Sequence, residues 1–197
     1  YIFKFGKIGL SAVYDSTNLN FGFDYRFHIK NYGLAGECAI DKKGNIATLH
    51  NFYFNTEYNI STNLMIRYYA KGYSCSFANA YSMKENSGET GFLWAFNWNI
   101  NEKWKWYNSA DIAFFLEEKY LISKPSVGYK INTHFSYNIA ENHLLNIKYS
   151  FDSKEKDDVD SKEHIRPTLP FYKHSVSVIY NGNFINGAIF KSGVMYN

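Results

Sequence analysis

The chain has 197 residues, of which 20% are aromatic, and its formal net charge is only +3. This length is enough for one domain with a sizeable core, whereas a mean hydropathy of -0.38 argues against a helical membrane protein. No stretch approaches the roughly 18 uninterrupted apolar residues of a membrane helix. Basic and acidic residues are interspersed, so the charge does not indicate nucleic-acid binding.

Polar and apolar residues alternate along nearly the whole chain, and this is the period of a β-strand. Leu19, Phe21 and Phe23, for example, share one side of an extended chain, opposite Asn20 and Gly22. No segment has a convincing helical period, so we expect little helix. The pattern predicts about eleven strands, near 3–14, 18–28, 32–41, 46–58, 62–71, 91–99, 104–115, 127–138, 143–152, 172–181 and 183–196.

Short and variable connections alternate between these strands. The short set comprises 28–31, 58–62, 99–103, 138–143 and 181–183. The interleaved set includes two tight turns, and its long polar members are 72–90, 116–126 and 153–171. Outer-membrane barrels have this asymmetry, with short periplasmic turns and longer external loops. We therefore predict one domain over residues 1–197, an antiparallel up-and-down transmembrane β-barrel with these three long loops outside.

Two architectures fit a long amphipathic meander, and they differ in which face meets water. A soluble barrel encloses its apolar face, whereas a membrane barrel turns that face to lipid and lines its lumen with polar residues. Large rings occupy nearly every apolar position here, and a small soluble barrel would struggle to enclose them. Strands of roughly 9–11 residues are also long enough to cross a bilayer when tilted.

If the chain forms a membrane barrel, its lumen face and its lipid face each carry a set of candidate residues. We expect a mixed-charge polar network in the lumen: Asp24, Arg26, Glu37, Arg67, Lys71, Lys130, His134 and Lys148. A cross-brace of Asp24, Arg26, Glu37, Arg67 and Lys130 would close or plug the lumen. We expect these aromatic residues at the lipid face or its interfaces: Phe21, Phe23, Tyr25, Tyr68, Trp94, Trp98, Trp104, Phe135 and Tyr149.

An odd strand number is unusual, because single-chain bacterial barrels normally use an even count. An open edge in lipid would leave backbone groups without hydrogen bonds. The start inside a strand-like run favours a segment of a larger barrel over a miscount by one. We thus expect a non-enzymatic anchor or passage in the outer membrane of a Gram-negative bacterium, in contact with its lipid and with other envelope proteins.

Five stretches of the chain carry loop and strand motifs: GLAGECAIDKKGNIATLHNFYF (33–54), MIRYYAKGYSCSFANAYSMKENSGETGFLWAF (65–96), WKWYNSADIAFF (104–115), the PSVGY restart at 125–129 and RPTLPFYKHSVSVIYN (166–181). These motifs resemble a family of Bacteroidetes-type outer-membrane proteins with helix-hairpin-helix (ComEA-like) domains, and the resemblance spans about residues 9–196. It implies the barrel portion of such a protein. The family's DNA contact or periplasmic partner would come from helix-hairpin-helix repeats that this sequence does not contain.

Two other classes of function stay open. The first is an outer-membrane hydrolase with an active site at the external rim, for which His134 and Asp111 are the strand residues to consider. No GxSxG or HExxH motif is present, so we predict no catalytic residues. The second is a soluble ligand-binding β-barrel.

Metal and cofactor sites are not expected either. The acidic run 155–163 lacks the spacing of a calcium loop. The two cysteines, Cys38 and Cys75, form no zinc pattern and leave one disulfide or two free thiols open.

Overall fold

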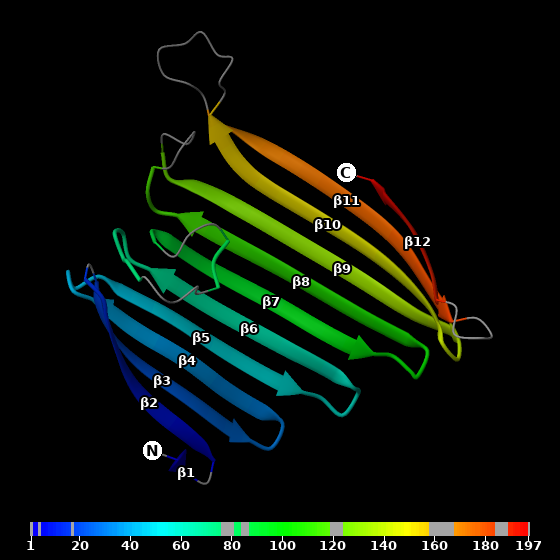
Figure 1. Ribbon diagram of the computed structural model, residues 1–197, viewed down its shortest axis with the longest axis horizontal. Coiled ribbons are helices and arrows are strands. Elements are labelled where there is room, and N and C mark those ends of the chain that lie inside the picture. The colour runs from blue at the N-terminus through cyan, green and yellow to red at the C-terminus, as the bar shows by residue number, and fades with distance from the viewer. Residues whose placement is uncertain are drawn as a thin grey trace.

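In the computed structural model the chain forms one antiparallel sheet of twelve strands in sequence order, without a crossover (Figure 1). The structure describes residues 2–3, 5–16, 18–75, 81–83, 87–118, 124–157, 168–183 and 189–196. The strands are β1 (Ile2–Phe3), β2 (Gly6–Tyr14), β3 (Leu19–Ile29), β4 (Tyr32–Asp41), β5 (Ile46–Asn55), β6 (Ile60–Tyr69), β7 (Glu89–Asn99), β8 (Trp104–Phe115), β9 (Ser126–Ala140), β10 (His143–Asp157), β11 (Thr168–Asn183) and β12 (Ile189–Tyr196).

The predicted all-β, up-and-down meander is confirmed. Ten long strands, β2–β11, make up the body of the sheet, and no helix occurs among the described residues. Accordingly, that part of the chain has no helix long and apolar enough to span a membrane.

Tight turns join strands along one rim of the sheet. The other rim has the three long loops and two tight connections, 15–18 and 42–45, as expected (Figure 1). Three tight turns contain a non-glycine residue with positive φ, namely Lys30 (52°), Asn59 (57°) and Asn142 (63°). A left-handed residue reverses the chain within a very short connection. On the opposite rim, residues 70–88, 116–125 and 158–167 connect β6–β7, β8–β9 and β10–β11.

The sequence prediction was wrong about the ends of the last long hairpin. β10 continues to Asp157 and β11 begins at Thr168, so the loop predicted at 153–171 is shorter, and 158–167 lies outside the described residues. Charged residues suggested a loop there, but Lys154 pairs with Phe171 and Lys156 with Leu169 in the ladder. The strand alternation continues there, because Lys154 and Lys156 share one face and Glu155 and Asp157 share the other.

The first predicted strand, 3–14, is divided into two. β1 folds back on β2 with Phe3 paired to Gly6, so β1 covers only the first two residues of β2. This division brings the strand number to twelve rather than eleven.

The sheet has two chemically different faces, which follow from its register. Cross-strand partners share a face, so the row Lys7, Arg26, Glu37, Leu49, Arg67 and Lys130 belongs to one face, here called the polar face. The other, the aromatic face, carries the alternate residues, including Phe23, Ile66, Phe92, Trp94 and Tyr129.

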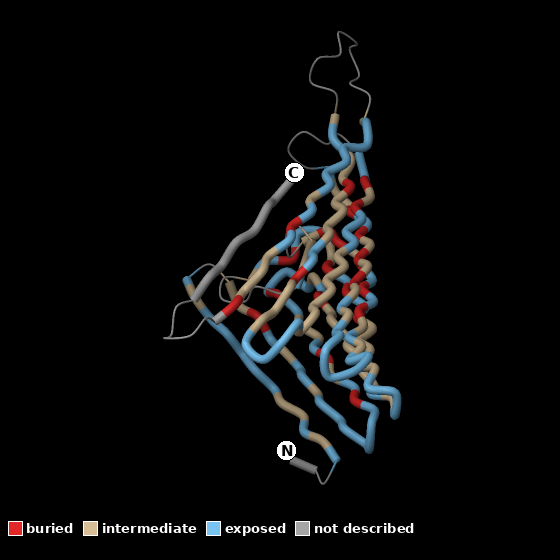
Figure 2. Tube along the Cα trace, turned by 90° about the vertical axis from the view of Figure 1, so that its right-hand side faces the viewer, coloured by how far each residue is buried: buried red, intermediate tan, exposed pale blue. Residues whose placement is uncertain are grey.

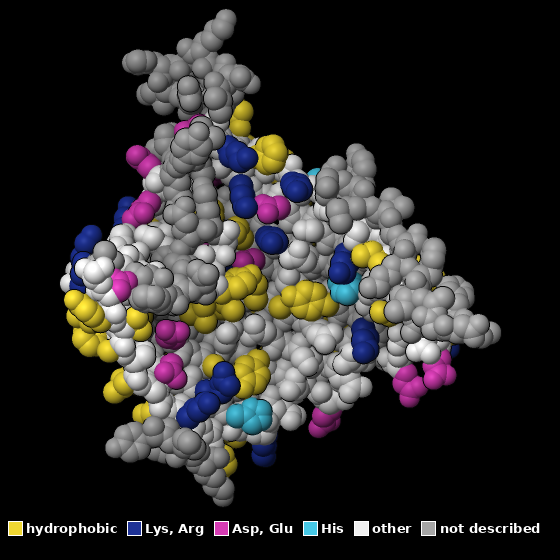
Figure 3. Space-filling view, viewed as in Figure 1, with side chains coloured by type: hydrophobic (Ala, Val, Ile, Leu, Met, Phe, Trp, Pro, Cys, Tyr) yellow, Lys and Arg dark blue, Asp and Glu magenta, His cyan; other side chains and the backbone are white. Residues whose placement is uncertain are grey.

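Curvature distinguishes the faces further. Strands near both edges lie on the same side of the central strands, so the sheet is concave toward the viewer of Figure 1 (Figure 2). Lys, Arg, Asp and Glu side chains are spread over that concave surface (Figure 3). The polar face is therefore the inner face of the curved wall, and the aromatic face is the outer one.

The sheet is nevertheless open. β1 and β12 are the first and last strands in the order, and the described residues of the two do not pair with each other. Whereas the sequence predicted a barrel or a segment of a larger one, the structure thus shows a curved, open wall. Its small core lies on the polar face, where Ala47, Tyr69 and Tyr73 form one buried cluster and Met65, Leu93 and Ala95 another.

Candidate functional site

A buried ion-pair cluster lies on the polar face of β6–β8, near the long-loop rim. Arg67 Nε donates to Glu89 Oε1 at 2.6 Å, and Arg67 Nη1 donates to Asp111 Oδ1 at 2.8 Å. The side chains of Arg67 and Glu89 are fully buried, and that of Asp111 is 5% exposed. Two carboxylates face one guanidinium, so the cluster carries a formal charge of −1 away from water.

Register explains how three neighbouring strands form this cluster. Arg67 on β6 is paired with Gly91 on β7, and Leu93 on β7 with Asp111 on β8, so all of them lie on the polar face. A Cβ at position 91 would lie 2.2 Å from Arg67 Cζ and 2.4 Å from Nη2. Gly91 therefore gives the guanidinium room to cross β7 and reach Asp111.

The loop between β6 and β7 folds inward over this cluster. Tyr81 donates its hydroxyl proton to Asp111 Oδ2 at 3.1 Å, and its ring lies 5.4 Å from Arg67 Cζ. Tyr69 donates to the Tyr81 carbonyl at 2.8 Å. The Met83 N–H donates to Glu89, at 3.0 and 3.1 Å from its two oxygens. The loop thus closes the cluster from the concave side.

A second set of hydrogen bonds holds the first part of the same loop. Ser74 N–H donates to Asp41 Oδ2 at 3.2 Å, and Asn20 Nδ2 donates to the Ser74 carbonyl at 2.8 Å. Asn45 Nδ2 donates to the Gly72 carbonyl at 3.1 Å. The loop is therefore fixed to β3 and the β4–β5 turn as well as to β6–β8.

Burial changes the acidity of two tyrosines in this loop. Desolvation, together with the negative charge of Asp111, raises the pKa of Tyr81 from 10.0 to about 12. Desolvation and Cys75 raise the pKa of Tyr73 in the same way, also to about 12. Both phenols are therefore neutral donors at ordinary pH.

The predicted lumen network forms only in part. Asp24, Arg26 and Glu37 lie together on β3 and β4, and with Lys7 they line a hollow of about 320 Å³. The prediction that Arg67 belongs to the same cross-brace was wrong. Its partners are Glu89 and Asp111, because Leu49 occupies the place opposite Arg67 on β5. Lys71 is exposed in the turn after β6 and lies outside the sheet.

The remaining predicted polar residues lie on β9 and β10. Lys148 is paired with His134, and Lys130 with Asp152. His134 Nε2 lies 2.9 Å from Asn146 Oδ1 and 3.1 Å from Ser136 Oγ.

The two residues considered for hydrolysis do not come together. Asp111 is held by Arg67, whereas His134 contacts Asn146 and Ser136. Ser136 also donates to Asn146 Oδ1 at 2.9 Å, so serine and asparagine meet at the same ring nitrogen of His134. In a hydrolase relay the nucleophile and the orienting group contact opposite ring nitrogens. The arrangement therefore differs from a catalytic triad.

All nine aromatic residues predicted for the lipid side lie on the aromatic face: Phe21, Phe23, Tyr25, Tyr68, Trp94, Trp98, Trp104, Phe135 and Tyr149. Many large apolar side chains there are exposed, such as Phe21 (53%), Ile66 (57%) and Trp94 (42%). Ring contacts are frequent near the tight-turn rim, where the Trp104 and Tyr137 centroids are 4.2 Å apart.

Both cysteines are free and lie on opposite sides of the sheet. Cys38 is paired with Phe23 and Thr48 on the aromatic face. Cys75 packs against the cluster of Ala47, Tyr69 and Tyr73 on the polar face. The sheet itself therefore separates the two thiols.

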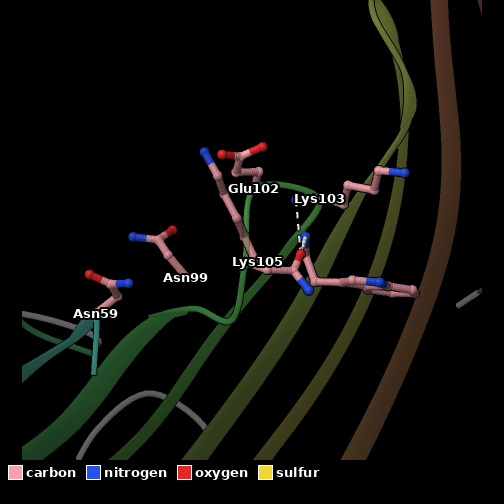
Figure 4. Close-up of a pocket in the computed structure, with 7 residues that line it drawn as sticks. Asn59, Asn99, Glu102, Lys103 and Lys105 are labelled. Atoms are coloured by element: carbon pink, nitrogen blue, oxygen red, sulfur yellow. Dashed lines mark hydrogen bonds between the residues drawn. The ribbon is translucent and has the colours of Figure 1, made fainter.

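A hollow of about 950 Å³ lies between two tight turns at the rim. Asn59 and Asn99 lie on one side of it, and Glu102, Lys103 and Lys105 on the other (Figure 4). Among the described residues, no group of three or more His, Cys, Asp or Glu side chains could hold a metal ion here or elsewhere.

No family model matches the sequence, and no curated protein or solved structure is significantly similar to it. The family resemblance noted from the motifs therefore stays a prediction.

The sequence reading missed Glu89 and Tyr81 as members of the cluster. Alternation along β7 places Glu89 on the same face as Gly91 and Leu93, so strand parity was the available signal. Tyr81 lies in a loop, where no periodic pattern indicates contacts.

Proposed function

We propose that this chain forms the wall, or a segment of the wall, of an outer-membrane β-barrel that serves as an anchor or passage within a larger protein or envelope assembly. One observation carries the proposal. From β2 to β9, the described residues of the aromatic face include no Lys, Arg, Asp or Glu. An exposed apolar face of this extent is typical of a surface that contacts lipid or a partner.

The direction of curvature favours lipid over a soluble barrel. A soluble barrel would enclose the aromatic face and expose the polar one. Here the concave side carries charged residues (Figure 3) and the Arg67 cluster. The register places the rings on the opposite, convex side. This polarity is the one expected of a wall with lipid outside and water inside.

Histidines on the aromatic face are satisfied within the sheet, which further supports a lipid environment. The three described ones each hydrogen-bond a tyrosine hydroxyl: His50 with Tyr25 at 2.7 Å, His143 with Tyr180 at 2.5 Å and His174 with Tyr149 at 3.0 Å. Polar groups facing hydrocarbon need such internal partners, because lipid offers none.

Strand lengths and ring placement are consistent with a bilayer. β2–β8 have 9–12 residues, close to the roughly 9–11 of a tilted membrane strand. Trp98, Trp104 and Trp106 lie near the tight-turn rim, where an aromatic girdle would meet the interface. In this arrangement the tight turns are periplasmic and the long loops are external.

Closing the wall requires further pairing at its edges. β1 covers only Gly6 and Lys7 of β2, and β12 covers β11 from Val176 to Asn183. Unpaired strand edges in lipid cost several kcal/mol for each unsatisfied group. We infer that additional strands, from the same protein or another envelope protein, complete the barrel.

Membrane fractionation of cells expressing the full protein tests the proposal. We expect it in the outer-membrane fraction, released by detergent and not by high salt or alkaline carbonate. After reconstitution, the purified protein should float together with the lipid vesicles in a density gradient. Recovery of folded protein in aqueous buffer without detergent would contradict the proposal.

A further inference from the structure

The polar face has a very uneven charge distribution, which becomes clear when each strand is assigned its register. On β2–β4, Lys7 and Arg26 are accompanied by Asp24 and Glu37. On β8–β11, Asp111 is already paired with Arg67, and Asp152 is the other carboxylate among the described strand residues of this face. The lysines of the same region are Lys105, Lys130, Lys148, Lys154, Lys156 and Lys173.

These six lysines, here called the lysine track, run from one rim of the wall to the other. Lys105 lies near the tight turns, and Lys148 lies two residues further along the ladder, which is one step on the same face. Lys130 and Lys173 lie two such steps beyond Lys148, on either side of Asp152. Lys154 and Lys156 continue toward the long loops. A step on one face spans about 7 Å, which is below the Debye length of about 8 Å at physiological salt. Lysines one step apart, such as Lys154 and Lys156, therefore act on an anion together. Lys148 lies two steps, about 14 Å, from Lys130 and Lys173, so an anion passes from one group of charges to the next.

Most of the track is accessible and uncompensated. Lys130, Lys148 and Lys173 are exposed and make no ion pair within the described part of the chain. Lys154 Nζ lies 3.6 Å from Asp152, with both side chains about a third exposed. Figure 3 shows Lys and Arg side chains gathered over this part of the concave surface.

Neutral hydrogen-bonding groups fill the gap between the charged positions. Ser150 donates to Asn132 Oδ1 at 3.0 Å, and Asn132 Nδ2 donates to Ser109 at 3.2 Å. Such a row can solvate an anion between two ammonium groups. Two separate rings lie on this stretch of the face, Tyr107 on β8 and Phe171 on β11, and Lys156 Nζ already lies 4.5 Å from the Phe171 ring. They do not form the row of rings on which successive bases stack. The chemistry thus favours a small anionic solute over a nucleic acid.

We propose that the lysine track is a path along the inner wall for small anions. These anions are halides or small solutes that bear carboxylate or phosphate groups. The inference rests on the proposed membrane barrel and adds a solute class to it. A charged cleft raises the local concentration of oppositely charged solutes by about 10- to 1,000-fold. The wall should therefore favour anions over cations of similar size.

Reversal potentials in planar bilayers test this path, with the full protein and a potassium chloride gradient. The wild type should have a chloride-to-potassium permeability ratio well above one. The triple variant Lys130→Gln/Lys148→Gln/Lys173→Gln should lower that ratio by about tenfold. A matched control, Lys30→Gln/Lys42→Gln/Lys43→Gln, removes as many charges from exposed turns at the rims and should leave the ratio within about twofold.

The outcomes separate this inference from the membrane proposal. Flotation with vesicles, measured on the same preparations, reports insertion. Three results with inserted protein would contradict the lysine track: no ion conduction, no preference for chloride, or an unchanged preference in the triple variant. None of these three results would contradict the membrane barrel. Protein that does not insert would overturn both.

Discussion

Arg67 on β6 and Asp111 on β8 are joined across β7 by a buried 2.8 Å ion pair. Its partner Glu89 and the inward-folded loop complete a closed cluster. In a curved wall with few buried apolar contacts, such a cluster fixes three strands and one loop relative to each other. The cluster therefore ties β6, β7 and β8 to the β6–β7 loop near the long-loop rim, and the lysine track lies beside it on β8–β11.

Arg67→Met should destabilise the protein by about 3–5 kcal/mol, because it leaves two buried carboxylates without a counterion. The free energy of unfolding in detergent, from a urea titration, measures this loss. Arg26→Met is the control: Arg26 is exposed on the same face, so its loss should cost about 0.5 kcal/mol or less.

A compensated variant distinguishes lost charge balance from lost packing. Arg67→Met combined with Glu89→Gln and Asp111→Asn removes all three charges, and it should regain a large part of the stability. If the triple variant is as unstable as Arg67→Met alone, the ion pairs are not what holds the cluster.

High pH should release the β6–β7 loop. The folded pKa of Tyr81 is about 12, above its ordinary value of 10.0, so its contribution to docking is complete below about pH 10 and is lost as the pH rises toward 12. The phenolate cannot donate to Asp111 and repels it. Proteolysis of the loop across this range should show a step that is smaller in Tyr81→Phe and unchanged in Tyr58→Phe, a substitution in an exposed turn.

A charge on the aromatic face should be costly although the site is exposed. Ile66 is 57% exposed in the middle of β6, and Ile66→Arg should destabilise the protein in vesicles by about 2–4 kcal/mol if that site faces lipid. Asn97→Arg places the same charge at an exposed position of the polar face and should cost about 0.5 kcal/mol or less. Equal and small effects of both substitutions would argue for water on both faces.

Most of the meander could be predicted from the sequence, because alternation is a local property. Rows such as Leu19, Phe21 and Phe23 mark both the strand and its face without knowledge of any partner. The ends of β10 and β11 were predicted wrongly, because charged residues such as Lys154 and Lys156 are more typical of a loop than of a strand.

The site could be predicted only in part, because it depends on register and on a loop. Arg67 was recognised as a polar-face residue, but its choice of Glu89 and Asp111 over Glu37 follows from which residues the ladder places beside it. The lysine excess on β8–β11 likewise becomes visible only after four strands are aligned. Tyr81 could not be found, since loop contacts have no period.

Fluorescence quenching of the natural tryptophans tests the orientation of the wall most directly. The four tryptophans of the chain, Trp94, Trp98, Trp104 and Trp106, all lie on the aromatic face. In vesicles, lipids brominated on their acyl chains should quench this fluorescence strongly, and aqueous iodide should have little effect. Strong quenching by iodide with none by brominated lipid would contradict a lipid-facing aromatic face.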